Sequence, residues 1–282
     1  MIDRNRIAEL VRAALEERVG AEAAAARARD SSGALLLRPD RGVNLGAPFD
    51  PPTMARLLQV TPARIAVGRT GAGTRYRTNT LLRFRADHAV AKDAVMSEVD
   101  AALIERLGLS EVRTRATDKP MFLQRPDAGR TLSEPARAQL AAQLPRAPKL
   151  VVIYGDGLSA AAINQHLPTF HEALLRELAA RGIPHPPPLF VRYARVKVMD
   201  EIARLCGAEA ALFVCGERPG LGFADSLSAY YIYNPREGAT DADREVISNI
   251  NPRGVPPAEG ARRAAEALVR VLREQKSGVV VG

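Results

Sequence analysis

The chain has 282 residues, a hydrophobic content of 46%, a charged content of 26% and a formal net charge of +8. These values are typical of a soluble globular protein with one large or two ordinary domains. No apolar run approaches the roughly 20 residues that a membrane-spanning helix needs, and the charged N-terminus does not resemble a signal peptide. We therefore expect a cytoplasmic protein with no membrane partner.

The excess positive charge is confined to one part of the chain. Residues 1–50 and residues 150–282 each contain as many acidic as basic side chains, so the whole excess lies in residues 51–149. Such a region could face nucleic acid, an anionic ligand or an acidic protein, or it could be a solvated arginine-rich face. No zinc-finger spacing, RNP-like motif or basic heptad array accompanies it, so we expect no nucleic-acid partner.

The N-terminal segment, residues 1–52, is predicted to contain a short amphipathic helix and a linker. Apolar residues recur at helical spacing over residues 1–20, and glycines and prolines are frequent after that. The helix either packs on its own protein or acts as a docking peptide. The linker would separate it from the rest of the chain.

The next segment, residues 53–148, is predicted to be mainly helical. The pattern indicates a helix over residues 78–108 and a second helix that begins after Ser133, which is a good N-cap. The loop between them carries two arginines and an aspartate that either hold an anion or join the loop by ion pairs. We favour ion pairs for this set, which is Arg125, Asp127 and Arg130.

From residue 149 onward, apolar runs typical of strands alternate with helical patterns. The strand candidates are 149–154, 188–198, 210–216 and 226–234, and the longest helix candidates are 160–182 and 258–278. This alternation predicts an α/β fold, with a Rossmann-like, mostly parallel sheet preceded by the mainly helical region. The segments GDGLS, RYARVK and GERPGLG each follow a strand candidate, so they should meet at the carboxyl edge of the sheet, where ligands bind.

One of these turns fits a dinucleotide-binding fingerprint. Residues 155–160 (GDGLSA) follow a predicted strand, open a predicted helix and match G-x-G-x-x-A. The next strand offers Arg192 and Arg195 where an NAD site needs an acidic residue, and Asp156 would lie unfavourably close to a pyrophosphate. An NADP-dependent oxidoreductase is therefore the alternative function, although a tight turn within the sheet is the commoner reason for such a sequence.

The sequence offers no evident catalytic or metal-binding set. None of the four histidines forms an H-E-x-x-H motif or a Cys/His cluster, and there is no G-x-S-x-G elbow or Walker A loop. Cys206 and Cys215 lie in apolar surroundings without metal-ligand spacing, which predicts buried free thiols. We therefore expect a binding subunit with neither catalytic residues nor metal ligands of its own.

Several long motifs, in one order, closely resemble the small (light) subunit of ethanolamine ammonia-lyase. They are LLRFRADHAVAKDAV, RPDAGR, YGDGLSAAAI, FVRYARVKVMDEI, GERPGLGFADSLSAYYIYNPR, ADREVISNI and LREQKSG, and the similarity runs from about residue 65 to the C-terminus. The resemblance implies a lyase that converts ethanolamine to acetaldehyde and ammonia by a radical rearrangement with adenosylcobalamin. A large TIM-barrel subunit would hold the substrate and the reactive face of the cofactor. The small subunit would cover the other side of the cofactor, so that the enzyme is a hetero-oligomer.

The resemblance also assigns cofactor contacts. Val196, in the R-V-K segment, and Glu217, in G-E-R-P-G, match contact residues of the family, and Val246 stands in the A-D-R-x-x-I-S-N segment, where relatives often carry cysteine. Without the resemblance, both valines would be interpreted as core residues and Glu217 as a surface ion-pair partner. The glycines of GERPGLG are expected to let the backbone approach the corrin ring.

Further expectations concern the cofactor and the partner. Cobalamin proteins that replace the lower benzimidazole ligand carry a D-x-H-x-x-G segment, which residues 87–92 do not fit. The resemblance therefore implies that the cofactor keeps its own benzimidazole on cobalt and is shared with the large subunit. Residues 149–282 would form the cobalamin-binding domain, whereas residues 53–148 would dock on an acidic face of the large subunit through Arg75, Arg77, Arg83 and Arg85. Enclosure in a bacterial microcompartment, with residues 1–20 as its targeting peptide, is left open.

Overall fold

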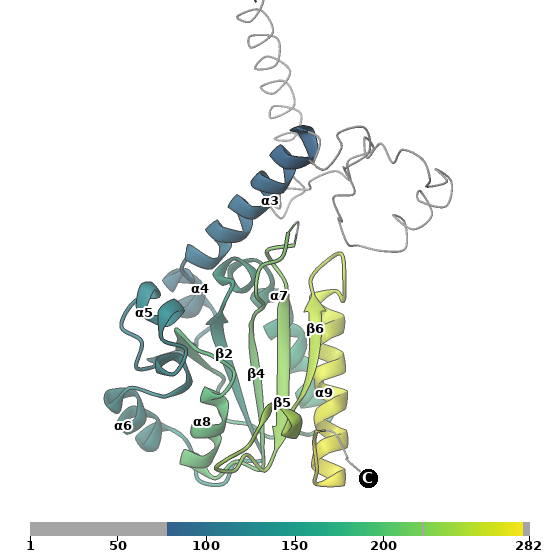
Figure 1. Cartoon of the computed structure of the whole chain (residues 1–282). Helices are drawn as coiled ribbons and strands as arrows, with labels where there is room; N and C mark the ends of the chain where they lie inside the picture. The colour runs from purple at the N-terminus through teal and green to yellow at the C-terminus, as the bar shows by residue number, and fades with distance from the viewer. Residues whose placement is uncertain (1–77, 222, 279–282) are drawn as a thin grey trace, which may run out of the picture. The chain divides into compact units, whose positions relative to one another are not determined.

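The computed structural model describes residues 78–221 and 223–278. The predicted helix over residues 1–20, the linker, and Arg75 and Arg77 lie outside these residues. The described part of the chain is built around one six-stranded sheet with helices on both faces (Figure 1). Within it, no helix is long and apolar enough to cross a membrane.

The sheet is mixed, with the strand order β1-β3-β2-β4-β5-β6. The strands are β1 (Ser110–Arg113), β2 (Leu150–Gly157), β3 (Leu189–Arg192), β4 (Ala210–Gly216), β5 (Leu227–Tyr233) and β6 (Glu245–Ile250). Strands β1, β3, β2 and β4 are parallel to one another, whereas β5 pairs antiparallel with both β4 and β6. Every residue of the central strands β2 and β4 is buried, as expected for strands that are covered on both faces. The predicted α/β class and mostly parallel sheet are confirmed.

Two layers of helices cover the sheet. The helices are α3 (Thr78–Met96), α4 (Ala101–Arg106), α5 (Lys119–Gln124), α6 (Glu134–Gln143), α7 (Ala160–Ala180), α8 (Val198–Cys206) and α9 (Pro257–Glu274), with 3-10 turns η1 (Ala128–Arg130) and η2 (Asp241–Asp243). Figure 1 shows α7 and α9, which contact each other, behind the sheet and α8 in front of it. Side chains of β2 alternate between the two sides: Val152 and Tyr154 join the core under α7 and α9, whereas Val151 and Ile153 join the core under α8.

The ends of several elements differ from the prediction. The helix expected over 78–108 is two helices, because the chain turns after Met96 and Asp100 then caps α4 by accepting a hydrogen bond from the Ala102 nitrogen. Strand β3 ends at Arg192 because Tyr193 has a φ of 56°, which a strand cannot contain. Ser133 is the N-cap of α6, as predicted.

Two edge strands were not predicted. Strand β1 lies within the region expected to be mainly helical and pairs with β3, and β6 pairs with β5. Both are short and partly exposed, so neither carries the continuous apolar run that marked the inner strands.

Candidate functional site

The three segments expected to meet at the carboxyl edge of the sheet are in direct contact. The carboxylate of Asp156 accepts hydrogen bonds of 2.8 Å from the backbone nitrogens of Tyr193 and Ala194, which follow β3. The backbone nitrogen of Leu158 donates to the carbonyl oxygen of Gly216, at the end of β4. This edge is therefore formed by GDGLS, RYARVK and the start of GERPG, as the order β3-β2-β4 requires.

Asp156 is the buried anion of this edge. It is fully buried, and burial raises its pKa to about 6. The N–H groups of Ala194 and Tyr193 and the positive charges of Lys119 and Arg192 lower the pKa, but by less than burial raises it. The two N–H bonds hold the chain in its sharp turn after β3. Asp156 thus fixes the start of the segment that carries Arg195 and Val196.

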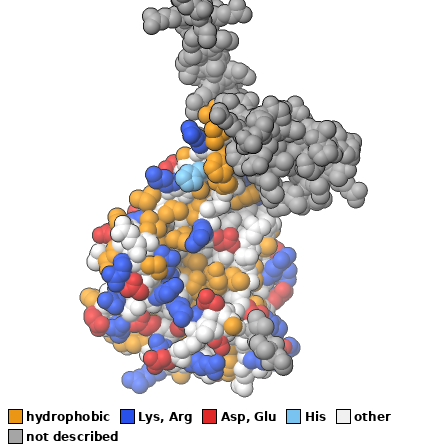
Figure 2. Space-filling view, in the orientation of Figure 1, with side chains coloured by type: hydrophobic (Ala, Val, Ile, Leu, Met, Phe, Trp, Pro, Cys, Tyr) orange, Lys and Arg blue, Asp and Glu red, His pale blue; other side chains and the backbone are white. Residues whose placement is uncertain are grey.

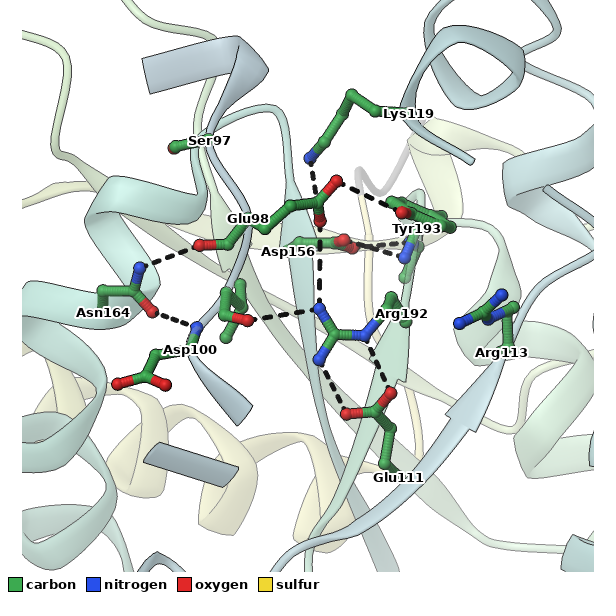
Figure 3. A network of polar contacts seen from close by, with 12 residues as sticks. Ser97, Glu98, Asp100, Glu111, Arg113, Lys119, Asp156, Asn164, Arg192 and Tyr193 are labelled. Atoms are coloured by element: carbon green, nitrogen blue, oxygen red, sulfur yellow. Dashed lines mark hydrogen bonds and ion pairs between the residues drawn. The ribbon is translucent and has the colours of Figure 1, made fainter. Parts of the chain in front are cut away.

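A charged network surrounds Asp156 (Figure 3). The guanidinium of Arg192 donates two hydrogen bonds of 2.8 Å to Glu111 of β1 and one of 3.2 Å to the Val99 carbonyl. Glu98 accepts a bond of 3.2 Å from the Tyr193 hydroxyl and lies 3.8 Å from the Lys119 ammonium. The network joins the α3–α4 connection, β1 and α5 to the end of β3.

The sequence did not reveal this network. Arg192 and Glu111 are 81 residues apart, and Tyr193 and Glu98 are 95 apart, so no local spacing relates them. The sequence of β1, SEVR, has a single apolar residue, so it carries no period-2 pattern that would predict a strand.

The glycines of the G-x-G-x-x-A turn bring strands together. A Cβ atom on Gly155 would lie 2.7 Å from the Cβ of Ala194, and one on Gly157, whose φ is 57°, would collide with the backbone of Gly216. The N-cap of α7, Ser159, accepts a bond from Ala162 and donates one of 2.6 Å to the Ala224 carbonyl. These contacts give no support to the NADP-dependent alternative, since the turn is packed against its own chain.

The two described glycines of GERPGLG, Gly216 at the end of β4 and Gly220 in the loop, have different surroundings. A Cβ atom on Gly216 would collide with the backbone of Ser159, whereas one on Gly220 would make only an ordinary contact with Phe223. Gly222 lies outside the described residues. The close approach at Gly216 is thus to the chain itself, and it holds the 217–226 loop beside the start of α7.

Glu217 supports the end of the sheet. One of its carboxylate oxygens, Oε1, accepts bonds of 2.6 Å from the Ser228 hydroxyl and from the backbone nitrogen of Asn249. The register of β5 and β6 shifts between Leu227 and Ala229, so Asn249 belongs to a bulge and donates to this side chain. Among the described residues, we find no partner for the other oxygen, Oε2. Glu217 is therefore a hydrogen-bonded residue of the rim and has no ion-pair partner within the described chain.

The two predicted valines lie on the α8 side of the sheet. Val196 is half-buried in the β3–α8 connection and packs against the core of that side, and so does Tyr230 of β5. Val246 is directly opposite Tyr230 in β6, so its side chain shares the same face, and it is 46% exposed. No α-helix of the described residues lies in front of β5 and β6, and only the short 3-10 turn η2 lies at the lower end of β5 (Figure 1). We call the surface of Val196, Tyr230 and Val246, with Glu217 at its rim, the open face.

The open face is interrupted by α8, because β5 and β6 are uncovered whereas every residue of β2 and β4 is buried. Its residues come from segments next to β3, β4, β5 and β6, and the sheet places four strand spacings between β3 and β6. At about 4.8 Å a spacing, this is roughly 19 Å. A ligand that contacts Val196 and Val246 together has to be broad enough to extend past the covered strands β2 and β4.

The loop ion pair and the two cysteines singled out in the sequence have structural roles. Arg125 and Asp127 form an exposed ion pair of 3.0 Å, as favoured above, but Arg130 takes no part in it. Cys206 and Cys215 are buried free thiols, as predicted, and burial raises the pKa of each. In the part of the chain that the structure describes, no three His, Cys, Asp or Glu residues are grouped as metal ligands.

Comparison with known proteins identifies the family. The family model described as ethanolamine ammonia-lyase light chain (EutC) matches residues 51–281. The chain is also 42% identical over 226 residues to the ethanolamine ammonia-lyase small subunit of Clostridium acetobutylicum, an alignment that covers 80% of this chain and 93% of that protein. The chain belongs to the ethanolamine ammonia-lyase light chain family.

Membership of the light chain family confirms the resemblance found in the sequence motifs. The match extends to residue 51, beyond the part in which those motifs lie. The GERPG, RYARVK and GDGLS motifs are the segments that meet at the carboxyl edge, so the motifs that carry the resemblance also form the rim of the open face. The roles of Val196, Glu217 and Val246 in this light chain remain predictions.

Proposed function

We propose that this chain is the small subunit of an adenosylcobalamin-dependent ethanolamine ammonia-lyase, and that its open face covers one side of the cofactor. The observation that carries the proposal is the exposed face of β5 and β6, which lies beside the family's motifs. The reaction is the conversion of ethanolamine to acetaldehyde and ammonia. The substrate would be held by a large TIM-barrel subunit in a hetero-oligomer.

The residues present fit the cofactor. Val196, Tyr230 and Val246 offer apolar contact to a broad corrin ring, and Glu217 has one oxygen, Oε2, to accept a hydrogen bond from an amide substituent. A buried donor without a partner, Nε of Arg195, lies next to Val196 in the chain. When bound, adenosylcobalamin would supply the radical chemistry that these side chains lack.

The contribution of this chain is position and exclusion of water. Its rigid sheet fixes the contact residues, and a bound large subunit would close the open face from solvent. His166 and His171 are buried in the α7 layer, which leaves neither free to ligate cobalt from the open face. We therefore propose that the cofactor keeps its benzimidazole and is shared with the large subunit.

The location of the enzyme is part of the same proposal. We place it in the cytoplasm, either free or inside a bacterial microcompartment. Residues 149–282 would form the Rossmann-like cobalamin-binding domain. Residues 53–148 would dock on the large subunit.

The test is reconstitution. This chain and the large subunit, purified separately and then mixed, should together retain cobalamin on gel filtration and release ammonia from ethanolamine when adenosylcobalamin is added. Either subunit alone should release none. Turnover by this chain alone, or a mixed complex that binds no cobalamin, would contradict the proposal.

A further inference from the structure

Three arginines from separate segments lie close enough for the charges of two of them, Arg130 and Arg218, to lower the pKa of the third, Arg195. Arg130 ends η1, Arg195 follows β3, and Arg218 follows β4. Among the described residues, none of the three has an acidic side chain within ion-pair distance. Figure 2 shows Lys and Arg side chains on this face of the molecule, with Asp and Glu side chains among them.

The nearby acidic side chains interact with other residues of the chain. Asp127 pairs with Arg125, and Glu201 accepts hydrogen bonds from Arg137 and from the Leu132 nitrogen. Glu217, which precedes Arg218, directs Oε1 at Ser228 and Asn249. The positive charge of the three arginines is therefore left without a counter-charge in the described chain.

Arg195 is held in place by its own surroundings. Its guanidinium lies 4.7 Å from the centre of the Phe122 ring, and its Nη2 donates a bond of 2.9 Å to the Phe122 carbonyl. Its backbone nitrogen donates a bond of 2.7 Å to the Gly129 carbonyl, and a Cβ on Gly129 would lie 3.1 Å from the Arg195 Cγ. Gly129 of the RPDAGR motif thus packs against Arg195 and helps to fix its position.

One donor of this fixed side chain is unsatisfied. Nε of Arg195 is buried and has no hydrogen-bond partner. A buried donor of a charged group is costly to leave unpaired. Burial, and then the charges of Arg130 and Arg218, lower the pKa of Arg195. The unpaired Nε and the neighbouring positive charges together indicate a binding place for an oxyanion that the chain itself does not supply.

We propose that Arg130, Arg195 and Arg218 bind a phosphate group. Guanidinium forks match phosphate oxygens, and three positive charges suit a group with several acceptor oxygens. The site adjoins Val196, so its phosphate source in the assembled enzyme is the phosphodiester in the nucleotide tail of cobalamin. This assignment of the source rests on the proposed function.

The test uses two corrinoids that differ in the tail. Cyanocobalamin contains the phosphodiester, whereas dicyanocobinamide has the same corrin ring without the nucleotide tail. Their affinities for the complex with the large subunit are measured by absorbance titration, for the unaltered chain and for Arg195→Met and Arg218→Gln. Arg218 is exposed, so its variant does not disturb the core. The matched control is Arg146→Gln, an exposed arginine before the amino end of β2.

We expect Arg195→Met and Arg218→Gln each to weaken cyanocobalamin binding by about 10- to 100-fold, as loss of a charge-assisted hydrogen bond does. Dicyanocobinamide binding should change by less than about twofold, and Arg146→Gln should alter neither affinity. Equal losses for both corrinoids, or no loss for either, would overturn the phosphate site while leaving the proposed function intact.

If the unaltered complex binds neither corrinoid, the proposed function fails and the cobalamin tail is excluded as the source. Inorganic phosphate then tests the site alone. A rise in the melting temperature of the unaltered chain with phosphate, absent in both variants, would retain the site as one for free phosphate. Equal responses of all chains would overturn it.

Discussion

Glu217, at the end of β4, accepts a 2.6 Å hydrogen bond from the backbone nitrogen of Asn249, at the bulge of β6. The strand between them, β5, contributes the Ser228 hydroxyl to the same oxygen. A single carboxylate thus joins the ends of three neighbouring strands. Any role of Glu217 toward a cofactor has to be separated from this role within the sheet.

The two roles of Glu217 respond differently to two substitutions. Glu217→Gln retains an oxygen that can accept from Ser228 and Asn249, but it replaces Oε2 by a donor and removes the charge. We expect it to unfold like the unaltered chain, and to weaken cobalamin binding by about 1.5–3 kcal/mol, or roughly tenfold to hundredfold. Urea unfolding and cobalamin titration of the complex measure the two effects.

Glu217→Ala removes both roles. It should lower the free energy of unfolding by about 1–2 kcal/mol, because the Ser228 hydroxyl and the Asn249 N–H lose their acceptor, and weaken cobalamin binding as well. If the Gln variant binds cobalamin as tightly as the unaltered chain, Glu217 is a structural residue alone.

The glycine turn after β2 gives the second prediction. Gly157→Ala should cost about 1–2 kcal/mol for the positive φ and about 1–3 kcal/mol more for the collision with the Gly216 backbone. Gly182→Ala is the matched control, because Gly182 has a φ of 65° but open space around its Cβ position. Chemical denaturation measures both. Equal costs would mean that β2 does not lie close enough to β4 for a Cβ on Gly157 to collide with Gly216.

Asp156 gives a pH-dependent prediction. Its pKa is raised from 3.8 to about 6 by burial, so the folded chain binds more protons than the unfolded chain between these values. The contribution of Asp156 to stability is then fully present below pH 3.8 and is lost as pH rises through about 6. A shift of about two pKa units corresponds to about 3 kcal/mol.

The measurement compares urea unfolding of the unaltered chain and Asp156→Asn from pH 4 to pH 7. The asparagine variant does not titrate, so the other ionisable groups cancel in the difference. The free energy of unfolding of the unaltered chain, minus that of the variant, should fall over this range. A difference that is constant, or that rises with pH, would show that the N–H bonds from Tyr193 and Ala194 outweigh burial.

The inner part of the fold could be predicted from the sequence, and the rest depends on partners distant in the chain. Continuous apolar runs located β2 and β4, and Ser133 marked the start of α6. Strand β6 was missed because its exposed residues, such as Val246, alternate with half-buried ones at an edge. The position of Tyr193, which ends β3, is set by Asp156, 37 residues earlier.

The candidate site divides in the same way. The meeting of three strand-end segments follows from parallel pairing, so the sequence could predict it. The bond from Asn249 to Glu217 depends on a bulge 32 residues away, which no local pattern indicates. The burial of the unpaired Nε of Arg195 depends likewise on the packing of Phe122 and Gly129 around this side chain.

The last prediction concerns the open face itself. Val246 is 46% exposed on the uncovered side of the sheet, and Val269 is 37% exposed on α9, on the opposite side. Val246→Asp and Val269→Asp should each change the free energy of unfolding of the chain by less than about 0.5–1 kcal/mol, because both side chains already meet solvent. Only Val246→Asp should weaken cobalamin binding by the complex, since it places a charge where a corrin ring needs apolar contact. Cobalamin titration of both complexes decides the matter: equal affinities would place the cofactor away from β6, and a loss confined to Val269→Asp would place it on the α7 and α9 side.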